Sequence, residues 1–164
     1  MLIRKALPSD AQDLVDLLLT LDRQTRFMLF EEGERQITVE KQTERLKSFE
    51  ADSEVMFVAV VDSKLVGFVV GIGGNARRNR HALYIVIGLL QSHVGQGIGK
   101  RLMQTLEDWS REYSFHRLEL TVMTHNERAI KLYEGCGFER EGVKQHSLLV
   151  DGHYVDEFYM AKLI

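Results

Sequence analysis

Hydrophobic and polar positions in the first third of the chain change from strand-like to helix-like spacing. Residues 2–6 are predicted to form a strand that ends before Pro8. Ser9 and Gln12 then have the spacing of a capping box, in which a hydroxyl meets free helix amides and the Gln side chain reaches back. A second helix is predicted over residues 38–49. The first helix carries its apolar face at Leu14, Leu17, Leu18 and Leu21.

Three β-rich segments follow in the middle of the chain. Residues 55–61 and 64–72 are rich in β-branched side chains, and the dipeptide Asp62-Ser63 between them predicts a hairpin. A glycine-rich stretch and the basic run RRNRH then indicate a loop. Residues 83–89 are almost continuously apolar, which predicts a strand covered on both faces of its sheet.

The second half of the chain returns to helical spacing. A third helix begins at a run of glycines, and a fifth strand is predicted over residues 117–122. Asn126 is a good N-cap for a fourth helix through Tyr133, which Gly135 or Gly137 can end. The apolar face of the third helix consists of Leu102, Leu106, Trp109 and Tyr113.

The last segment contains Asp151-Gly152 between two β-rich runs, the dipeptide most typical of a tight hairpin. The predicted order is therefore β-α-α-β-β-β-α-β-α-β-β. This order indicates an α/β fold, with a mixed sheet of about seven strands and about four helices on its two faces. No repeat or linker divides the sequence, so residues 1–164 are expected to form one domain.

Composition narrows the function classes. The chain has 164 residues, of which 27% are charged, and a net charge of only −3, which gives no general attraction for nucleic acid or anionic membranes. No stretch approaches the ~20 apolar residues of a membrane span. The first residues lack the apolar core of a signal peptide, so a cytoplasmic protein is expected. Cys136 is the single cysteine, which excludes an internal disulfide and a thiolate metal cluster, and no metal site is predicted.

The segment IVIGLLQSHVGQGIGKRL combines an apolar strand, a glycine run and the start of a helix. Such a helix start suits a phosphate, because its first amides are free and glycines let the anion approach. The spacing fits neither a P-loop nor a dinucleotide fingerprint, which would need a third glycine at Leu102. It fits the acetyl-CoA pyrophosphate loop R/Q-x-x-G-x-G/A at Gly97 and Gly99, with Val94 in the first position. A tight strand-to-helix turn without a ligand is the structural alternative.

The segment LELTVMTHNERAIKLYEGCGFEREG follows one helix and one strand later. Its N-x-x-A-x-x-x-Y spacing and the later Gly-Phe pair, together with the glycine loop, resemble the Gcn5-related N-acetyltransferase (GNAT) superfamily. The resemblance covers residues 54–164 well and the N-terminal third more weakly. It implies the GNAT fold, with a mostly antiparallel mixed sheet. It also implies acetyl-CoA as cosubstrate and direct acetyl transfer to a primary amine in a ternary complex.

The resemblance also assigns roles to residues. Tyr133 would donate a proton to the CoA thiolate, and a phenol with an ordinary pKa near ~10 stays protonated at neutral pH. The alternative is a core aromatic residue with a satisfied hydroxyl. Asn126 would cap its helix and meet the CoA arm. The residues implied to bind the cosubstrate are Gly88, Leu89, Val94, Gly95, Gln96, Gly97, Ile98, Gly99, Lys100 and Asn126.

The predicted site lacks one expected group, because many relatives place a glutamate on the fourth strand as general base and residues 82–90 contain none. His81, Tyr84, a carboxylate from elsewhere and a chain of waters are the alternatives, with water preferred. The acceptor amine is expected between the first two helices and the last hairpin. Candidate residues for it are Phe30, Glu31, Glu34 and Asp156, with Glu32 and Glu157 beside them.

The segment EREGVKQHSLLVDGHYVDEFYM is similar to the tails of small bacterial acetyltransferases that act on amino acids and related amines. A small amine is therefore the expected acceptor. A protein N-terminus or lysine is the enzymatic alternative, and a non-catalytic acyl-CoA-binding regulatory domain is the alternative from another class. The resemblance also implies a possible homodimer through the C-terminal strands.

Overall fold

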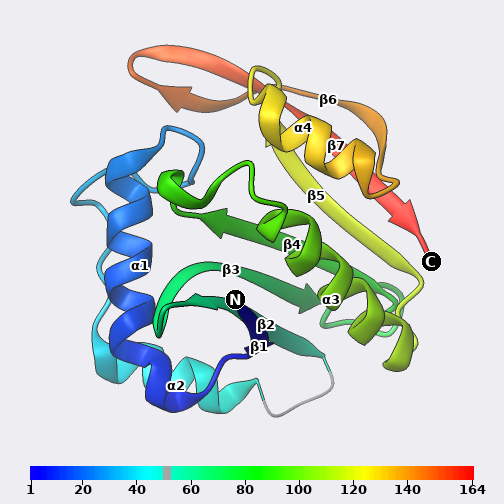
Figure 1. The fold of residues 1–164 in the computed structure, drawn as a ribbon. Coiled ribbons are helices and arrows are strands. Elements are labelled where there is room, and N and C mark those ends of the chain that lie inside the picture. The colour runs from blue at the N-terminus through cyan, green and yellow to red at the C-terminus, as the bar shows by residue number, and fades with distance from the viewer. Residues whose placement is uncertain (50–52) are drawn as a thin grey trace.

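The computed structural model describes residues 1–49 and 53–164, which form a seven-stranded sheet between two pairs of helices (Figure 1). The strand order is β1-β2-β3-β4-β5-β7-β6, and every neighbouring pair is antiparallel except β4 and β5. The predicted α/β class and element order are confirmed. The elements are β1 (Leu2–Lys5), α1 (Ala11–Gln24), α2 (Val39–Ser48), β2 (Glu54–Val61), β3 (Lys64–Gly73), β4 (Ala82–Leu89), α3 (Ile98–Glu112), β5 (Arg117–Met123), α4 (Glu127–Gly135), β6 (Glu139–Val150) and β7 (His153–Leu163).

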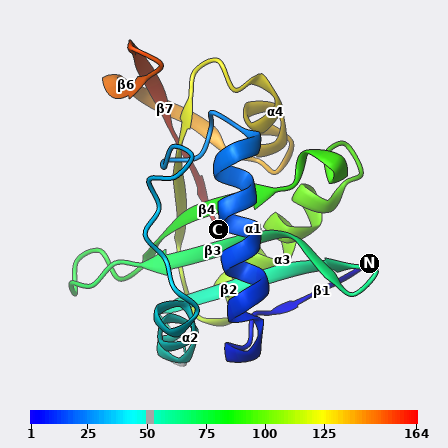
Figure 2. The ribbon, with the colours of Figure 1, turned by 90° about the vertical axis from the view of Figure 1, so that its left-hand side faces the viewer.

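The sheet has a separate apolar core on each face. Helices α1 and α2 cover one face of β2 and β3, where Leu14, Leu21 and Val58 are almost fully buried (Figure 2). On the other face α3 packs with Leu102 and Leu106 completely enclosed. Each fully buried leucine contributes on the order of 1.5–3 kcal/mol through removal of apolar surface from water. The two cores fix the sheet between the helix pairs.

Both hairpins that the sequence predicts are present. Asp62 and Ser63 have φ angles of 47° and 61°, and Asp151 and Gly152 have 48° and 79°. Positive φ at both central residues is the geometry of a type I′ turn, whose twist matches that of the paired strands. The turns therefore set the register of β2 with β3 and of β6 with β7.

The predicted capping box at Ser9 is wrong. A short 3₁₀ turn, Pro8–Asp10, precedes α1, because proline favours the first turn of a helix. The Asp10 carboxylate accepts the Leu7 amide at 2.7 Å and also two hydrogen bonds from Arg4, at 2.7 and 2.8 Å. Asp10 thus closes the turn that Ser9 was expected to close.

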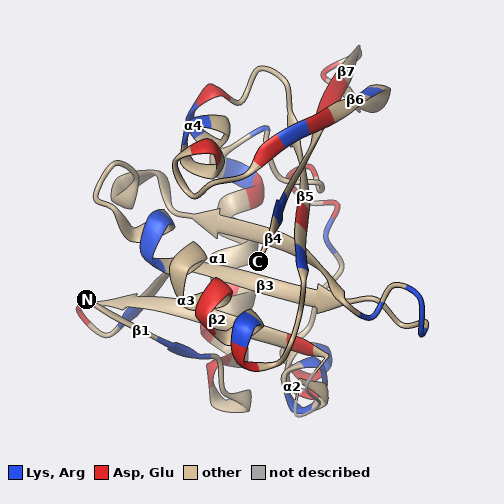
Figure 3. Ribbon diagram, turned by 90° about the vertical axis from the view of Figure 1, so that its right-hand side faces the viewer, with Lys and Arg blue, Asp and Glu red and all other residues tan. Residues whose placement is uncertain are grey.

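Lys and Arg segments alternate with Asp and Glu segments along the ribbon on the side of the molecule that Figure 3 shows. Along β6, for example, Arg140 lies between Glu139 and Glu141. Among the residues that the structure describes, none of the helices is long and apolar enough to span a membrane. The same residues contain no group of three or more His, Cys, Asp or Glu side chains placed to hold a metal ion.

Candidate active site

The loop between β4 and α3 has two glycines in the left-handed backbone region. Gly95 has a φ of 78°, and Gly97, the N-cap of α3, has a φ of 77°. A Cβ added at either position would meet no atom within 4 Å, so the space in front of the loop is open. The first amides of a helix have no acceptor within it, and Gly97 offers them no side chain. This end of α3 therefore fits an anion such as a pyrophosphate.

The other predicted loop residues differ in their packing and in how far their side chains are accessible. A Cβ on Gly99 would lie 3.1 Å from the Leu132 side chain, so this glycine permits close packing of α3 on α4. Ile98 is 2% exposed, and its side chain belongs to the core. The Gln96 amide donates to a backbone carbonyl across the loop at 3.1 Å. The predicted residues whose side chains stay at least partly accessible here are Val94, Gln96 and Lys100.

Strands β4 and β5 separate beyond their first three residues. Their parallel pairing runs from Ala82 with Arg117 to Tyr84 with Glu119 and then stops. Residues 85–89 of β4 therefore have no partner on the β5 side, so the two strands splay apart here. The prediction that both faces of this strand are covered holds except at Tyr84, which is 39% exposed. The unpaired edge offers main-chain donors and acceptors to an extended ligand.

Gly88 and Leu89 lie at the open end of this splay, still paired with β3. A Cβ on Gly88 would come within 2.7 Å of Phe68 and 2.8 Å of Leu21. The glycine is thus required by the packing of α1 on the sheet, whatever else its backbone does. The position of these two residues is compatible with the predicted role in binding the CoA arm.

Tyr133 is 7% exposed and lies on α4, with its ring 6.1 Å from the ring of Phe138. Its hydroxyl has no hydrogen-bond partner within the described residues, and it is not among the fully enclosed unpaired polar atoms. Burial raises the pKa of Tyr133 well above its usual value, and the nearby Tyr84 and Cys136 raise it further. The hydroxyl is therefore protonated and unused, as a general acid must be, although the raised pKa makes its proton harder to transfer.

Two further side chains lie near the ends of the splay. The Asn126 side chain accepts the Ala129 amide at 3.3 Å and caps α4, as predicted. The Tyr84 hydroxyl lies 3.0 Å from the Thr121 hydroxyl, so the two side chains join β4 to β5 just beyond the last backbone pair.

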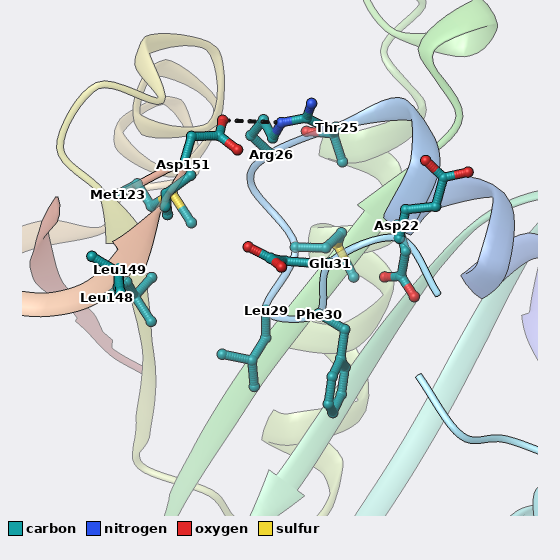
Figure 4. Close-up of a pocket in the computed structure, with 13 residues that line it drawn as sticks. Asp22, Thr25, Arg26, Leu29, Phe30, Glu31, Met123, Leu148, Leu149 and Asp151 are labelled. Carbon is teal, nitrogen blue, oxygen red and sulfur yellow. Dashed lines mark hydrogen bonds and ion pairs between the residues drawn. The ribbon is translucent and has the colours of Figure 1, made fainter. Parts of the chain in front are cut away.

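A cavity of about 250 Å³ lies beside the end of β5 (Figure 4). We call it the acceptor cavity. It is formed by the end of α1 with the loop that follows, by Met123 and by the hairpin between β6 and β7. Its lining consists of Asp22, Thr25, Arg26, Met28, Leu29, Phe30, Glu31, Glu32, Met123, Leu148, Leu149, Val150 and Asp151.

The four predicted acceptor residues divide between this lining and its supports. Phe30 and Glu31 line the acceptor cavity, and the Glu31 carboxylate extends toward its centre (Figure 4). Glu34 is outside the lining, where its carboxylate accepts the Glu31 amide at 2.9 Å. Asp156 also is outside, and it accepts the His146 amide at 2.8 Å. The structure therefore brings two of the four to the cavity.

Two ion pairs hold the walls of the acceptor cavity. Arg35 binds the carboxylate of Asp22 with two hydrogen bonds, at 2.6 and 2.9 Å, and its guanidinium lies 4.6 Å from the Phe30 ring centre. Asp22 is only 2% exposed, so this pair fixes the loop after α1 from below. At the mouth, Arg26 reaches Asp151 at 3.2 Å and joins the loop to the hairpin (Figure 4).

Comparison with known families shows to which family the chain belongs. A model of the acetyltransferase (GNAT) family matches residues 17–138, which is more than half of the chain. The chain belongs to this family. The predictions of the superfamily, of the fold and of an N-acetyltransferase at the level of the family are confirmed. Acetyl-CoA is the cosubstrate of GNAT enzymes.

Curated relatives of this GNAT protein differ in their acceptors. L-amino acid N-acetyltransferase AaaT of Escherichia coli is 33% identical over 110 residues, 65% of this chain and 66% of that protein. The E. coli enzyme named for the alanine of ribosomal protein uS5 is 30% identical over 101 residues, 61% of this chain and 52% of that protein. The chain thus spans about half to two thirds of these relatives.

Solved structures resemble the whole GNAT chain. An acetyltransferase of the GNAT family from Streptococcus pneumoniae has a TM-score of 0.96 at 28% identity, covering 99% of this chain and 98% of that one. The Salmonella typhimurium protein yncA, solved with its cofactor acetyl-CoA, has a TM-score of 0.89 at 16% identity, covering 99% and 93%. The second likeness concerns the fold alone.

A bulge in β6 brings together side chains that sequence spacing did not connect. The register shifts between Lys144 and Leu148, and Ser147 lies in the bulge, where its hydroxyl donates to the Glu157 carboxylate at 2.8 Å. Glu157 is 8% exposed and pairs with Met123 across β5 and β7, so it lies next to a wall of the acceptor cavity. The sequence pattern of residues 139–150 does not predict this bulge.

The structure also bears on the missing general base. His81 directly precedes β4, and its carbonyl accepts the amides of His116 and Arg117 at 2.9 and 3.1 Å. It therefore lies where β4 and β5 are paired, at the opposite end from the acceptor cavity. Two buried carboxylates lie at the cavity, Asp22 and Glu157, and Asp22 is already bound by Arg35. Glu157 is therefore better placed than His81 to act as the base.

Proposed function

We propose that this GNAT protein transfers an acetyl group from acetyl-CoA to the primary amine of a small molecule, by direct attack in a ternary complex. The observation that carries the proposal is the splay of β4 from β5. Its open end lies beside the acceptor cavity, and the strand edge continues into the glycine loop at the start of α3. The glycine loop, the free strand edge and the cavity together support a proposed path for the pyrophosphate, the CoA arm and the amine.

The chain supplies different contacts along this surface. Backbone amides of residues 95–99, with Lys100 beside them, would hold the pyrophosphate. The edge of β4 at Gly88 and Leu89 would pair with the amide groups of the CoA arm, and an amide there would stabilise the developing oxyanion. Asn126, at the start of α4, would meet the same arm. The open space in front of Gly95 and Gly97 is consistent with these roles.

The proposed reaction needs one acid and one base. The neutral amine attacks the thioester carbonyl carbon, a C–N bond forms and the C–S bond breaks. The sulfur leaves with the proton of the Tyr133 hydroxyl, so that free CoA thiol is released. The proton lost from the attacking nitrogen passes to a base, for which we propose Glu157, either directly or through water. Solvent returns a proton to Tyr133 and removes the one taken up by the base.

Release of CoA thiol, measured with a thiol reagent across amines, amino acids, polyamines and short peptides, tests the proposal together with calorimetry of acetyl-CoA binding. Turnover of a small amine supports it. Turnover of peptides alone would favour the protein acetyltransferase alternative. Binding of acetyl-CoA without turnover of any acceptor would favour the regulatory alternative, and absence of binding would overturn the proposal.

The predicted homodimer is a separate proposal that sedimentation would test.

A further inference from the structure

The walls of the acceptor cavity combine apolar and polar surface in about equal parts. At about 250 Å³ the cavity lies just below the ~300–1,000 Å³ of ordinary small-molecule pockets, which favours a compact acceptor. Apolar side chains come both from the loop after α1 and from the β6–β7 hairpin, on opposite sides of the space (Figure 4). These apolar side chains are Met28, Leu29, Phe30, Met123, Leu148, Leu149 and Val150.

The charges of the lining do not cancel. Of its acidic residues, Asp22 is neutralised by Arg35 and Asp151 is paired with Arg26. The carboxylates of Glu31 and Glu32 have no hydrogen-bond or ion-pair partner among the described residues. The uncompensated charge of the lining is therefore negative.

The described residues that line the cavity also include no free cation. Arg26 is the one basic residue among the described residues that line the cavity, and its guanidinium is already bound to Asp151. A free amino acid carries a carboxylate one carbon away from its amine. Such a carboxylate would meet the exposed, unpaired carboxylates of Glu31 and Glu32, and like charges at this distance repel. To be neutralised it would have to displace Asp151 from Arg26.

From this arrangement we infer that the acceptor is a small primary amine with an apolar body and no carboxylate beside the amine. The inference rests on the proposed acetyltransferase function and specifies its substrate class. Glu31 holds the ammonium group of the arriving amine, and the leucine and methionine side chains of the two walls enclose its hydrocarbon part. Glu31 acts before the chemical step, because the amine must lose a proton before it attacks.

The matched substrates that test this inference are isoamylamine, L-leucinamide and L-leucine, which share one side chain and differ in the group beside the amine. We expect kcat/KM to be at least tenfold higher for isoamylamine and leucinamide than for leucine. Glu31→Gln should raise KM for isoamylamine at least tenfold while the Kd for acetyl-CoA stays unchanged. Glu44→Gln, which removes an exposed carboxylate on α2, is the matched control and should change neither quantity.

The Arg26→Gln variant tests whether the Arg26 side chain only pairs with Asp151 or also binds the carboxylate of a substrate. If the inference holds, the preference for isoamylamine over leucine persists in Arg26→Gln, whatever loss of the pair with Asp151 does to the rate with both substrates. Leucine turned over as well as isoamylamine, and lost in Arg26→Gln, would overturn the inference but leave the acetyltransferase intact. A protein that binds acetyl-CoA yet acetylates neither isoamylamine nor leucinamide would also contradict it. Failure to bind acetyl-CoA would instead contradict the proposed function itself.

Discussion

Replacement of Tyr133 by phenylalanine separates its chemical role from its structural one. The ring is buried in the core between α4 and the sheet and lies against Phe138, so a phenylalanine ring keeps these contacts. The change removes one oxygen atom that has no hydrogen-bond partner among the described residues. The structural consequence of Tyr133→Phe is therefore expected to be small.

The expected change in unfolding free energy is much smaller than the expected change in transition-state free energy, so the two roles of Tyr133 can be told apart. An intramolecular hydrogen bond contributes ~0.5–1.5 kcal/mol, and because Tyr133→Phe breaks none, the free energy of unfolding should change by less than about 1 kcal/mol. A general acid contributes a factor of ~10²–10⁴ in rate, or about 3–5 kcal/mol of transition-state free energy. A large loss of kcat with a nearly unchanged midpoint of unfolding is thus the expected combination.

The raised pKa of Tyr133 adds a pH dependence to the same variant. Burial, with Tyr84 and Cys136, favours the protonated phenol in the folded state. Its contribution to stability is complete below the unfolded pKa near ~10 and is lost as pH rises through the folded value. Above pH ~10 the Tyr133→Phe variant should therefore lose stability less steeply than the native chain.

The assay is initial-rate release of CoA thiol at saturating acetyl-CoA, combined with thermal unfolding and calorimetry of acetyl-CoA binding. Tyr113→Phe is the matched control, because Tyr113 stacks on Trp109 at the far end of α3 and should leave kcat unchanged. A loss of kcat below threefold in Tyr133→Phe would refute the role as acid. A loss of several kcal/mol in stability would refute the inference that the hydroxyl is unpaired.

Three other predictions concern the supports of the site. Gly97→Ala should cost about 1–2 kcal/mol of unfolding free energy, because its φ of 77° is unfavourable for a side chain, and should weaken acetyl-CoA binding in calorimetry. Arg35→Ala should cost about 3–5 kcal/mol in urea unfolding by leaving the buried Asp22 unpaired, and adding Asp22→Asn should restore part of this. The hydrogen bond from Arg4 lowers the pKa of Asp10, so acid should destabilise the chain below the unfolded pKa near ~4. Asp10→Asn should flatten that acid limb of the stability curve, and an unchanged limb would contradict the assignment.

The parts of the fold that could be predicted are those whose causes are local. The type I′ turns at residues 62–63 and 151–152 depend on residues that tolerate positive φ, and the start of α4 depends on the side chain of Asn126. The glycine loop was predictable for the same reason, since Gly95 and Gly97 adopt positive φ there. In each case a few adjacent residues contain the whole physical reason.

The parts that could not be predicted depend on residues far apart in the chain. Asp156 and Glu157 are adjacent carboxylates that the sequence alone does not distinguish. In the structure, the His146 amide in the β6 bulge donates to Asp156, and the Ser147 hydroxyl donates to Glu157. The exposure of Tyr84 likewise depends on where the helices end over the sheet. The wrong capping prediction at Ser9 has a local cause, because Pro8 places the first turn ahead of Ser9.

This difference separates the two ends of the proposed site. Binding of the cosubstrate depends on the loop and helix start at residues 94–100 and on the neighbouring strand edge, which one short segment of sequence encodes. The acceptor cavity depends on the loop after α1, on the end of β5 and on the β6–β7 hairpin, held together by ion pairs such as that of Arg26 with Asp151, 125 residues apart. Substitutions on any of the three segments can change the cavity without touching the glycine loop. The chain can therefore share its cosubstrate with relatives named for amino acids and a ribosomal protein even if, as we propose, its cavity takes a different amine.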